Sequence, residues 1–248
     1  MLDVLTNQNL PPSEKSRKRM LDESQLVIGA GLSTTGWAAT VAIYHILAKP
    51  EILQRMRQEL IPIIPFGEKR RDCTDLDWGA LEGLPFFQGC IKEGLRLSYG
   101  MSARNARRTA KEIIYTESAN ANPKKGKNQT QGKSWHIPAY AAVSLSNPVI
   151  SHNENIFPDS YAFKPERWVG PNKVPDKYFV TFGKGPRMCL GMQLAWAELS
   201  LMLAGVVRWF DMELYETDER SVRMSADVTI PVPETRAGVR VIVKNELD

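Results

Sequence analysis

Residues 182–191 read Phe182-Gly183-Lys184-Gly185-Pro186-Arg187-Met188-Cys189-Leu190-Gly191, a loop in which glycines frame a single cysteine, and the apolar-striped segment Met192 to Phe210 follows it. A thiolate at a helix N-terminus is stabilised by free backbone N–H groups and by the helix dipole. Gly185 and Gly191 let the backbone approach a ligand closely and adopt conformations closed to other residues. Arg187 can bind a carboxylate beside the sulfur through a charge-assisted hydrogen bond. One thiolate and one guanidinium in one loop suit haem, which needs an axial ligand and partners for its propionates.

A second pattern joins two distant segments. Glu93-Gly94-Leu95-Arg96 lies in the predicted helical stretch Phe87 to Ser98. Residues three apart share a helix face, so the carboxylate of Glu93 can pair with the guanidinium of Arg96 and leave the arginine fork free for a further partner. The sequence offers Pro165-Glu166-Arg167-Trp168 as the segment that supplies this partner.

The N-terminal part carries an uncharged run from Leu26 to Ala48, between Glu23 and Lys49. Its length and hydropathy alone would allow a membrane span. The run also contains hydroxyl groups and a histidine, and its flanks are typical of a soluble helix, which Asp22 or Ser24 could cap and Lys49-Pro50 could end. The sequence therefore predicts a long helix over about 22–48.

These segments together resemble the cytochrome P-450 monooxygenases. The cysteine loop matches that family's haem-binding pattern, Phe-x-x-Gly-x-Arg-x-Cys-x-Gly, at all five defined positions. Glu-x-x-Arg, Pro-Glu-Arg-aromatic and the long central helix are also features of the family. The resemblance implies a mainly α fold with small β-sheets, the C-terminal half of the P-450 fold, as one truncated domain over 1–248. Residues 28–36 and 216–220 resemble the corresponding segments of fungal P-450 enzymes of secondary metabolism.

The resemblance also assigns roles around the haem. It implies Cys189 as the axial thiolate ligand of the iron, with Arg187 on a propionate and with Phe182, Gly183 and Gly191 shaping the loop. It places an arginine of the predicted strand 101–109 on a propionate, either Arg107 or Arg104, with Arg107 preferred. It further implies a buried ion network that fixes the segment before the cysteine loop, formed by Glu93, Arg96 and Arg167.

On the oxygen-binding side, the resemblance gives roles to Ala30-Gly31-Leu32-Ser33-Thr34-Thr35. Gly31, next to Ala30, opens room for dioxygen, and Thr34 relays protons to it. An alternative is that the hydroxyl of Thr34 bonds back to its own helix. Ser33 departs from the family, which commonly has an acidic residue there, and this departure leaves the proton pathway and the reaction type open.

Two further segments are candidates for contact with a substrate in the family's pocket. One follows the Glu-x-x-Arg helix, and the other lies in the final hairpin; simple packing is the alternative for each. The candidates are Met101, Ser102 and Ala103, and Val228, Thr229 and Ile230.

The remaining elements are less distinctive. The sequence predicts a helix over 51–61, a connecting loop over 75–85, a hairpin of 113–115 with 135–138, and a flexible insert over about 116–134 that is too polar to order itself. The predicted helix after the cysteine loop covers about 192–210. Loop and strands follow to the C-terminus.

Composition limits the functional classes. A net charge of +4 among 248 residues is too small and too dispersed to indicate nucleic-acid binding. Three cysteines, Cys73, Cys90 and Cys189, show neither metal spacing nor a disulfide framework, and the histidines are scattered.

The resemblance implies a monooxygenase that oxidises an apolar small molecule with O2 and with electrons from NADPH through a flavoprotein reductase, for which Lys184 is a contact candidate. It implies the cytosolic face of the endoplasmic reticulum membrane for a complete protein, while this chain is expected to carry no anchor of its own. Two alternatives remain. One is a haem-thiolate isomerase, dehydratase or peroxide-using enzyme, suggested by Ser33. The other is a truncated, non-catalytic fragment unable to hold haem.

Overall fold

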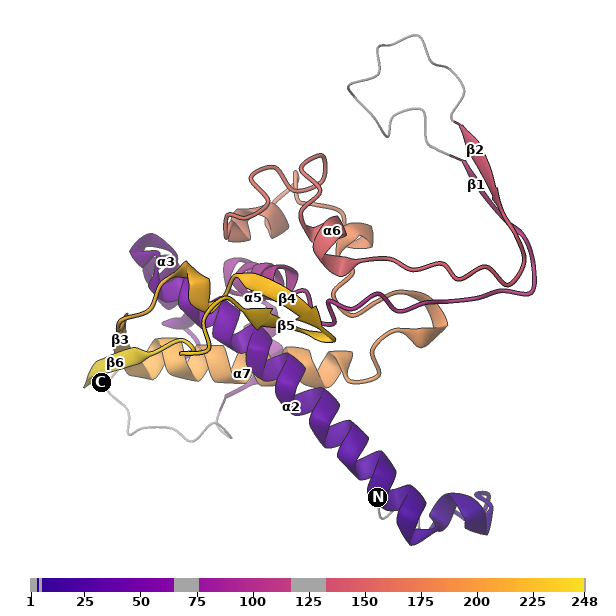
Figure 1. The fold of residues 1–248 in the computed structure, drawn as a ribbon. Helices are drawn as coiled ribbons and strands as arrows, with labels where there is room; N and C mark the ends of the chain where they lie inside the picture. The colour runs from indigo at the N-terminus through magenta and orange to yellow at the C-terminus, as the bar shows by residue number, and fades with distance from the viewer. Residues whose placement is uncertain (1–3, 5, 65–75, 117–132, 248) are drawn as a thin grey trace. The chain divides into compact units, whose positions relative to one another are not determined.

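The computed structural model of the chain describes residues 4, 6–64, 76–116 and 133–247. By their contacts, the positions up to Ala103 together with those from Asn147 form one unit, and Arg104–Ser146 form a second. The larger unit is mainly helical with two small sheets, and the smaller unit contains one β-hairpin (Figure 1). The predicted fold class, mainly α with small β-sheets, is confirmed.

The predicted central helix is α2, Arg17–Leu47, which begins before the expected position 22. Ser16 caps it by accepting a hydrogen bond from the backbone N–H of Arg19 at 3.3 Å, so the predictions of Asp22 or Ser24 as caps are wrong. A serine hydroxyl that binds a first-turn N–H satisfies a group that the helix itself leaves unpaired. The first turn of α2 therefore contains the basic residues Arg17, Lys18 and Arg19.

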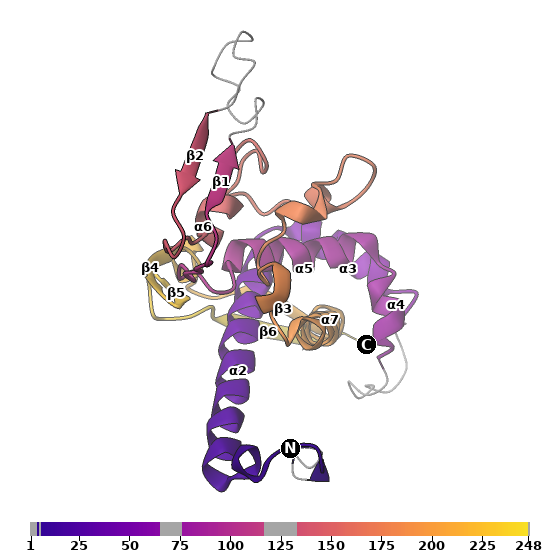
Figure 2. The same ribbon diagram turned by 90° about the vertical axis from the view of Figure 1, so that its right-hand side faces the viewer.

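The second half of α2 forms the centre of the core. It packs against α5, Pro85–Ser98, and α7, Met192–Trp209, while α3, Pro50–Leu60, packs on all three helices. In both views the first half of α2 extends beyond the other helices (Figures 1 and 2). The side chains there are exposed although apolar, among them Leu26, Val27, Ile28 and Leu32.

Two predicted segments have a different structure. The predicted loop 75–85 contains a helix, α4, Trp78–Glu82, because the side chain of Asp77 accepts from Gly79 N at 2.8 Å and caps its first turn. The predicted strand 101–109 is not a strand; its ladder bonding is a single bridge between Arg107 and Val143. The helix predicted over about 192–210 agrees with α7, Met192–Trp209, after which the chain is extended at Phe210.

The described strands form three antiparallel pairs. In the smaller unit β1, Ile113–Thr116, pairs with β2, Ser134–Ile137, and the predicted flexible insert between them lies largely outside the described residues. In the larger unit β3, Phe210–Leu214, pairs with β6, Val241–Glu246, and β4, Met224–Val228, pairs with β5, Ile230–Pro233. The helices are completed by α6, Asn147–Ser151, and by short 3₁₀ turns at Pro12–Lys15, Pro165–Trp168, Asp176–Tyr178, Gly185–Arg187 and Glu219–Ser221.

Candidate active site

The cysteine loop is an exposed, hydrogen-bonded turn that leads into α7. Its backbone closes on itself, because Cys189 N donates to Phe182 O at 2.8 Å. Gly183 and Gly185 have φ angles of 74° and 78°, the left-handed region that favours glycine. Gly191 is the N-cap of α7 with an ordinary φ of −86°, so the expected special conformation belongs to Gly183 rather than to Gly191.

The surface of this loop is open. The thiol of Cys189 is free and exposed, and Arg187 is exposed beside it. A Cβ atom added at Gly185 or at Gly191 would meet no atom within 4 Å, and the side chain of Leu190 is 99% exposed. An exposed thiol, an exposed arginine two residues before it and open space at both glycines fit a large planar group with carboxylates.

The start of the loop is held against α5. The buried hydroxyl of Thr181 donates to Leu95 O at 3.1 Å. Gly100, with a φ of 61°, lies so close that a Cβ there would be 2.8 Å from Thr181 O. Phe182 packs edge-on against Phe179 with ring centroids 6.1 Å apart. The position of the loop is therefore set from the core helix.

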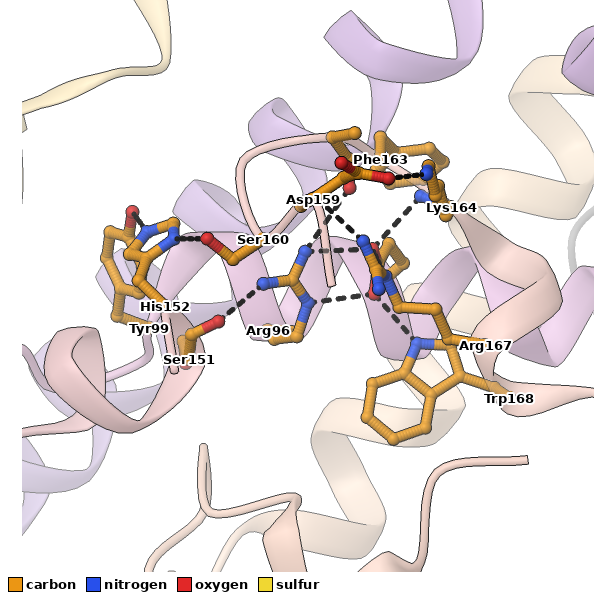
Figure 3. Close-up of polar contacts among 12 residues, drawn as sticks. Arg96, Tyr99, Ser151, His152, Asp159, Ser160, Phe163, Lys164, Arg167 and Trp168 are labelled. Atoms are coloured by element: carbon orange, nitrogen blue, oxygen red, sulfur yellow. Dashed lines mark hydrogen bonds and ion pairs between the residues drawn. The ribbon is translucent and has the colours of Figure 1, made fainter. Parts of the chain in front are cut away.

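The structure brings Glu93, Arg96 and Arg167 together (Figure 3). Glu93 is fully buried on α5 and accepts from Arg96 Nε at 2.9 Å, from Arg96 Nη2 at 2.8 Å and from Arg167 Nε at 3.1 Å. It also accepts from Trp168 Nε1 at 2.8 Å and from Lys164 N at 3.0 Å. One carboxylate thereby fixes the helix and the segment that contains Arg167.

The further partners of Arg96 differ from those predicted. Its Nη1 donates to Ser151 O at 2.7 Å and its Nη2 to Ala162 O at 3.4 Å, so backbone carbonyls take up the rest of the fork. Arg167 instead binds Glu93 and Asp159 O, the latter at 2.7 Å. This arrangement follows from charge, because two guanidinium groups share a carboxylate rather than bind each other.

A polar cluster that the sequence analysis missed lies beside this network. The hydroxyl of Tyr99 is 2.6 Å from His152 Nε2, and His152 Nδ1 is 3.2 Å from Ser160 Oγ (Figure 3). Burial lowers the pKa of His152 to about 4, helped by the charge of Arg96, and burial raises the pKa of Tyr99 to about 12. His152 and Tyr99 are far apart in the sequence, and no local pattern links them.

The candidate oxygen-side residues lie in the middle of α2, just before its buried residues begin at Ala38. The hydroxyl of Thr34 donates to Ala30 O at 2.7 Å, which is the bond back to its own helix that the alternative interpretation gave. Ser33 is exposed, and a Cβ at Gly31 would meet nothing within 4 Å. The hydroxyl of Thr34 still has acceptor capacity for a further proton donor.

The family model for cytochrome P-450 matches residues 1–239. The chain belongs to the cytochrome P-450 family. Its relatives include the cytochrome P-450 monooxygenases sdnE of Sordaria araneosa, 38% identical over 97% of this chain and 44% of that protein, and tpcC of Cochliobolus heterostrophus, 36% identical over 96% and 45%. A third, astB of Talaromyces wortmannii, is 37% identical over 96% of this chain and 49% of that protein. The predicted likeness to fungal members is confirmed.

This P-450 chain spans about half the length of the curated relatives it matches. Its α2 is also long and apolar enough to cross a membrane by length and composition, with a mean hydropathy of 1.5 in its most apolar window. The core helix of a soluble protein meets the same criterion, and 22% of this window is buried, so length and composition alone do not distinguish the two.

The other P-450 candidates divide between the two units. Arg104 and Arg107 belong to the smaller unit, where Arg107 Nη1 donates to Ala106 O at 3.1 Å, so their relation to the cysteine loop stays a prediction. Within the larger unit the two substrate-contact segments do meet. Ser102 N donates to Thr229 O at 3.0 Å, while Met101 and Val228 are exposed. Ala103 and Ile230 flank this contact.

Proposed function

We propose that the complete protein is a haem-dependent monooxygenase that oxidises an apolar small molecule with O2 and with electrons from a reductase. The observation that carries this proposal is the exposed thiol of Cys189 in a hydrogen-bonded, glycine-framed loop at the start of α7. Bound haem with a thiolate ligand supplies the activation of dioxygen, since the sulfur donates electron density to the iron.

In this proposal the residues of the chain hold and orient the group. Cys189 is the axial ligand, and the N–H of Cys189, bound to Phe182 O, keeps the sulfur at a fixed place in the loop. Arg187 binds one propionate, and Arg107 is the preferred partner of another. Glu93, with the two arginines on it, fixes the segment before the loop against α5.

Proton delivery falls to α2. The hydroxyl of Thr34 donates a hydrogen bond to Ala30 O, and its oxygen can accept a second one. Thr34 is therefore suited to bind a water molecule and to pass a proton onward. Ser33 can pass a proton but cannot store one as a carboxylate does. This difference favours a second candidate, a peroxide-using or isomerising enzyme of the same fold, which needs less external protonation.

The projecting half of α2 supports a further part of the proposal. Leu26, Ile28 and Leu32 are exposed in the described part of the chain, and burying such side chains is a large source of stability. We propose that these side chains are covered when the haem and the remainder of a full-length protein are in place, and that this chain alone binds haem weakly or not at all.

Electrons would come from NADPH through a flavoprotein reductase that docks near the cysteine loop. Lys184 is the contact candidate in that loop, where its Nζ donates to Asp176 O at 3.2 Å and its side chain stays exposed. The proposed location is the cytosolic face of the endoplasmic reticulum membrane.

Turnover separates the two candidate functions. We expect the complete, haem-loaded protein to oxidise an apolar substrate only when reductase, NADPH and O2 are all supplied. Activity that needs no reductase and no NADPH, but proceeds with hydrogen peroxide or by rearrangement alone, would favour the second candidate and reject the monooxygenase.

A further inference from the structure

Ser102 lies just after α5 and is buried, although its two hydrogen bonds reach a hairpin far along the chain. Its hydroxyl donates to Asp227 Oδ1 at 2.6 Å. Its backbone N–H donates to Thr229 O at 3.0 Å. One residue therefore holds the hairpin of β4 and β5 at two points, on the last residues of β4 and on the turn itself.

The turn of this hairpin is strained. Val228 pairs directly with Ile230, so Thr229 alone makes the turn, with a φ of 73°. A β-branched residue rarely adopts this left-handed conformation, and such conformations persist where surrounding contacts impose them. The carbonyl of Thr229 accepts the hydrogen bond from Ser102, which is such a contact.

The segment that carries Ser102 is itself fixed. The side-chain amide of Asn147 donates to Tyr99 O and to Met101 O, each at 3.1 Å. Between them Gly100 lies against the backbone of Thr181, the residue that precedes the cysteine loop. The hairpin turn is thus connected through residues 99–102 to the same support that positions the loop of Cys189.

The side chain at the hairpin tip gains little from packing. Val228 is 66% exposed in the described structure, so apolar contacts do not hold the tip in place. The position of Val228 and Thr229 relative to the cysteine loop then depends on the hydrogen bonds of Ser102 and Asp227.

We propose that Ser102 and Asp227 form a latch that fixes the hairpin tip, and that this latch limits the size of the apolar molecules that the pocket of the complete protein admits. The second half of the statement rests on the proposed function, and the first half does not. Ser102 is in this view a positioning residue, since its hydroxyl is committed to Asp227 and is not free to contact a substrate.

Hydrogen exchange followed by mass spectrometry tests the latch in the chain without haem. In Asp227→Ala we expect the peptides that contain Ser102 and Thr229 to exchange roughly tenfold faster, because a lost hydrogen bond of ordinary strength allows local opening. Asp227→Asn keeps an acceptor oxygen and should retain the protection. Asp227 is exposed, so its replacement leaves the core intact, and Ser102→Ala provides the second variant.

Ser225→Ala is the matched control. The hydroxyl of Ser225 donates to Val232 O and Pro233 O within the same hairpin, so this variant also loses serine hydrogen bonds but keeps the latch. The exchange of the Ser102 peptide should then stay at the wild-type rate. Equal exchange in wild type, Asp227→Ala and Ser102→Ala would overturn the latch.

Pocket size is tested with imidazole and 4-phenylimidazole as haem ligands, by optical titration of the haem-loaded complete protein. We expect the affinity ratio of the larger to the smaller ligand to rise several-fold in Asp227→Ala, and to stay unchanged in Asp227→Asn and Ser225→Ala. If hydrogen exchange is faster in Asp227→Ala but the affinity ratio is unchanged, the latch exists and its role in selecting ligands by size is rejected. A wild-type protein that takes up no haem would reject that role together with the proposed function, and the exchange result would still decide the latch.

Discussion

Glu93 shows at the scale of one residue what holds the larger unit together. Its buried carboxylate accepts five hydrogen bonds, from Arg96 twice, from Arg167, from Trp168 and from the backbone of Lys164. Burying a charge is costly unless it is paired and hydrogen-bonded, and here every oxygen is used. Removing this one carboxylate leaves buried guanidinium groups without their counter-charge.

We therefore predict that Glu93→Ala lowers the free energy of unfolding by about 3–5 kcal/mol, the usual cost of breaking a buried ion pair from one side. Chemical denaturation followed by circular dichroism measures the change. Glu166→Ala is the control, because Glu166 pairs with Arg55 at 3.1 Å on the surface with 59% of its side chain exposed. Its expected cost is below about 1 kcal/mol. Similar losses for both variants would contradict the structural role given to Glu93.

At this scale the sequence predicts local partners well and distant ones poorly. The i,i+3 pair of Glu93 and Arg96 follows from helix geometry alone. The carbonyl partners of Arg96 and the contact of Tyr99 with His152 join positions dozens of residues apart. No spacing rule connects such residues, because loops that have no periodicity bring them together.

At the scale of elements, the contact between α5 and α2 is set by one small residue. A Cβ atom at Gly94 would lie 2.7 Å from Ala42 Cβ and 3.3 Å from its Cα. The two helices can approach this closely only because Gly94 has no side chain. An added methyl group must push the helices apart or distort them.

We predict that Gly94→Ala destabilises the chain by about 1–3 kcal/mol through overpacking. Gly36→Ala, in the same helix as Ala42 but with no atom near its Cβ, should instead gain about 0.5–1 kcal/mol from helix propensity. Ala42→Gly combined with Gly94→Ala should cost less than the two single changes added, since the new methyl group then has room. If thermal unfolding shows that the costs of the two single changes simply add in the double variant, the contact between Gly94 and Ala42 is not the cause of the destabilisation.

His45 of α2 makes the stability of the fold depend on pH. His45 stacks on Phe163 with ring centroids 5.0 Å apart, and burial lowers its pKa from 6.5 to about 4, with a further contribution from the charge of Lys49. Between these values the unfolded chain holds a proton that the folded chain does not. The contribution of His45 to the free energy of unfolding is therefore fully present at neutral pH, and it is lost as the pH drops from 6.5 toward 4.

We predict a loss of about 2 kcal/mol from His45 between pH 7 and pH 5, measured by denaturant unfolding at each pH. His45→Gln should be less stable at pH 7 but should flatten this part of the pH dependence. His136→Gln, at a largely exposed side chain in the smaller unit, is the control. An unaltered pH slope in His45→Gln would assign the effect to other groups.

The sequence predicts an element reliably when its pattern of apolar residues repeats over several turns. The uncharged run of α2 and the apolar stripe of α7 extend over many turns, so both helices are evident in the sequence. The five residues of α4 carry no such repeat, and only its cap at Asp77 marks it. The strand expected over 101–109 forms ladder bonds only at Arg107, and Thr109 is its only β-branched residue, so the segment lacks the residue types that strands favour.

At the scale of the whole molecule, the chain belongs to the P-450 family but spans about half the length of its relatives, which bears on its capacity to bind haem. The cysteine loop and its support are complete in the larger unit, whereas the first half of α2 leaves apolar side chains in solvent. We therefore expect the chain alone to take up haem in less than equimolar amount. A stable monomer that purifies with one haem per chain would contradict this expectation.

Thiolate ligation of haem by Cys189 is tested by the ferrous–carbon monoxide difference spectrum of the chain with excess haem. Ligation by Cys189 predicts a red-shifted Soret band from the haem that binds to the wild type and to Cys73→Ser, and no such band in Cys189→Ser. The same red-shifted band in Cys189→Ser, or bound haem in the wild type without that band, would contradict this ligation.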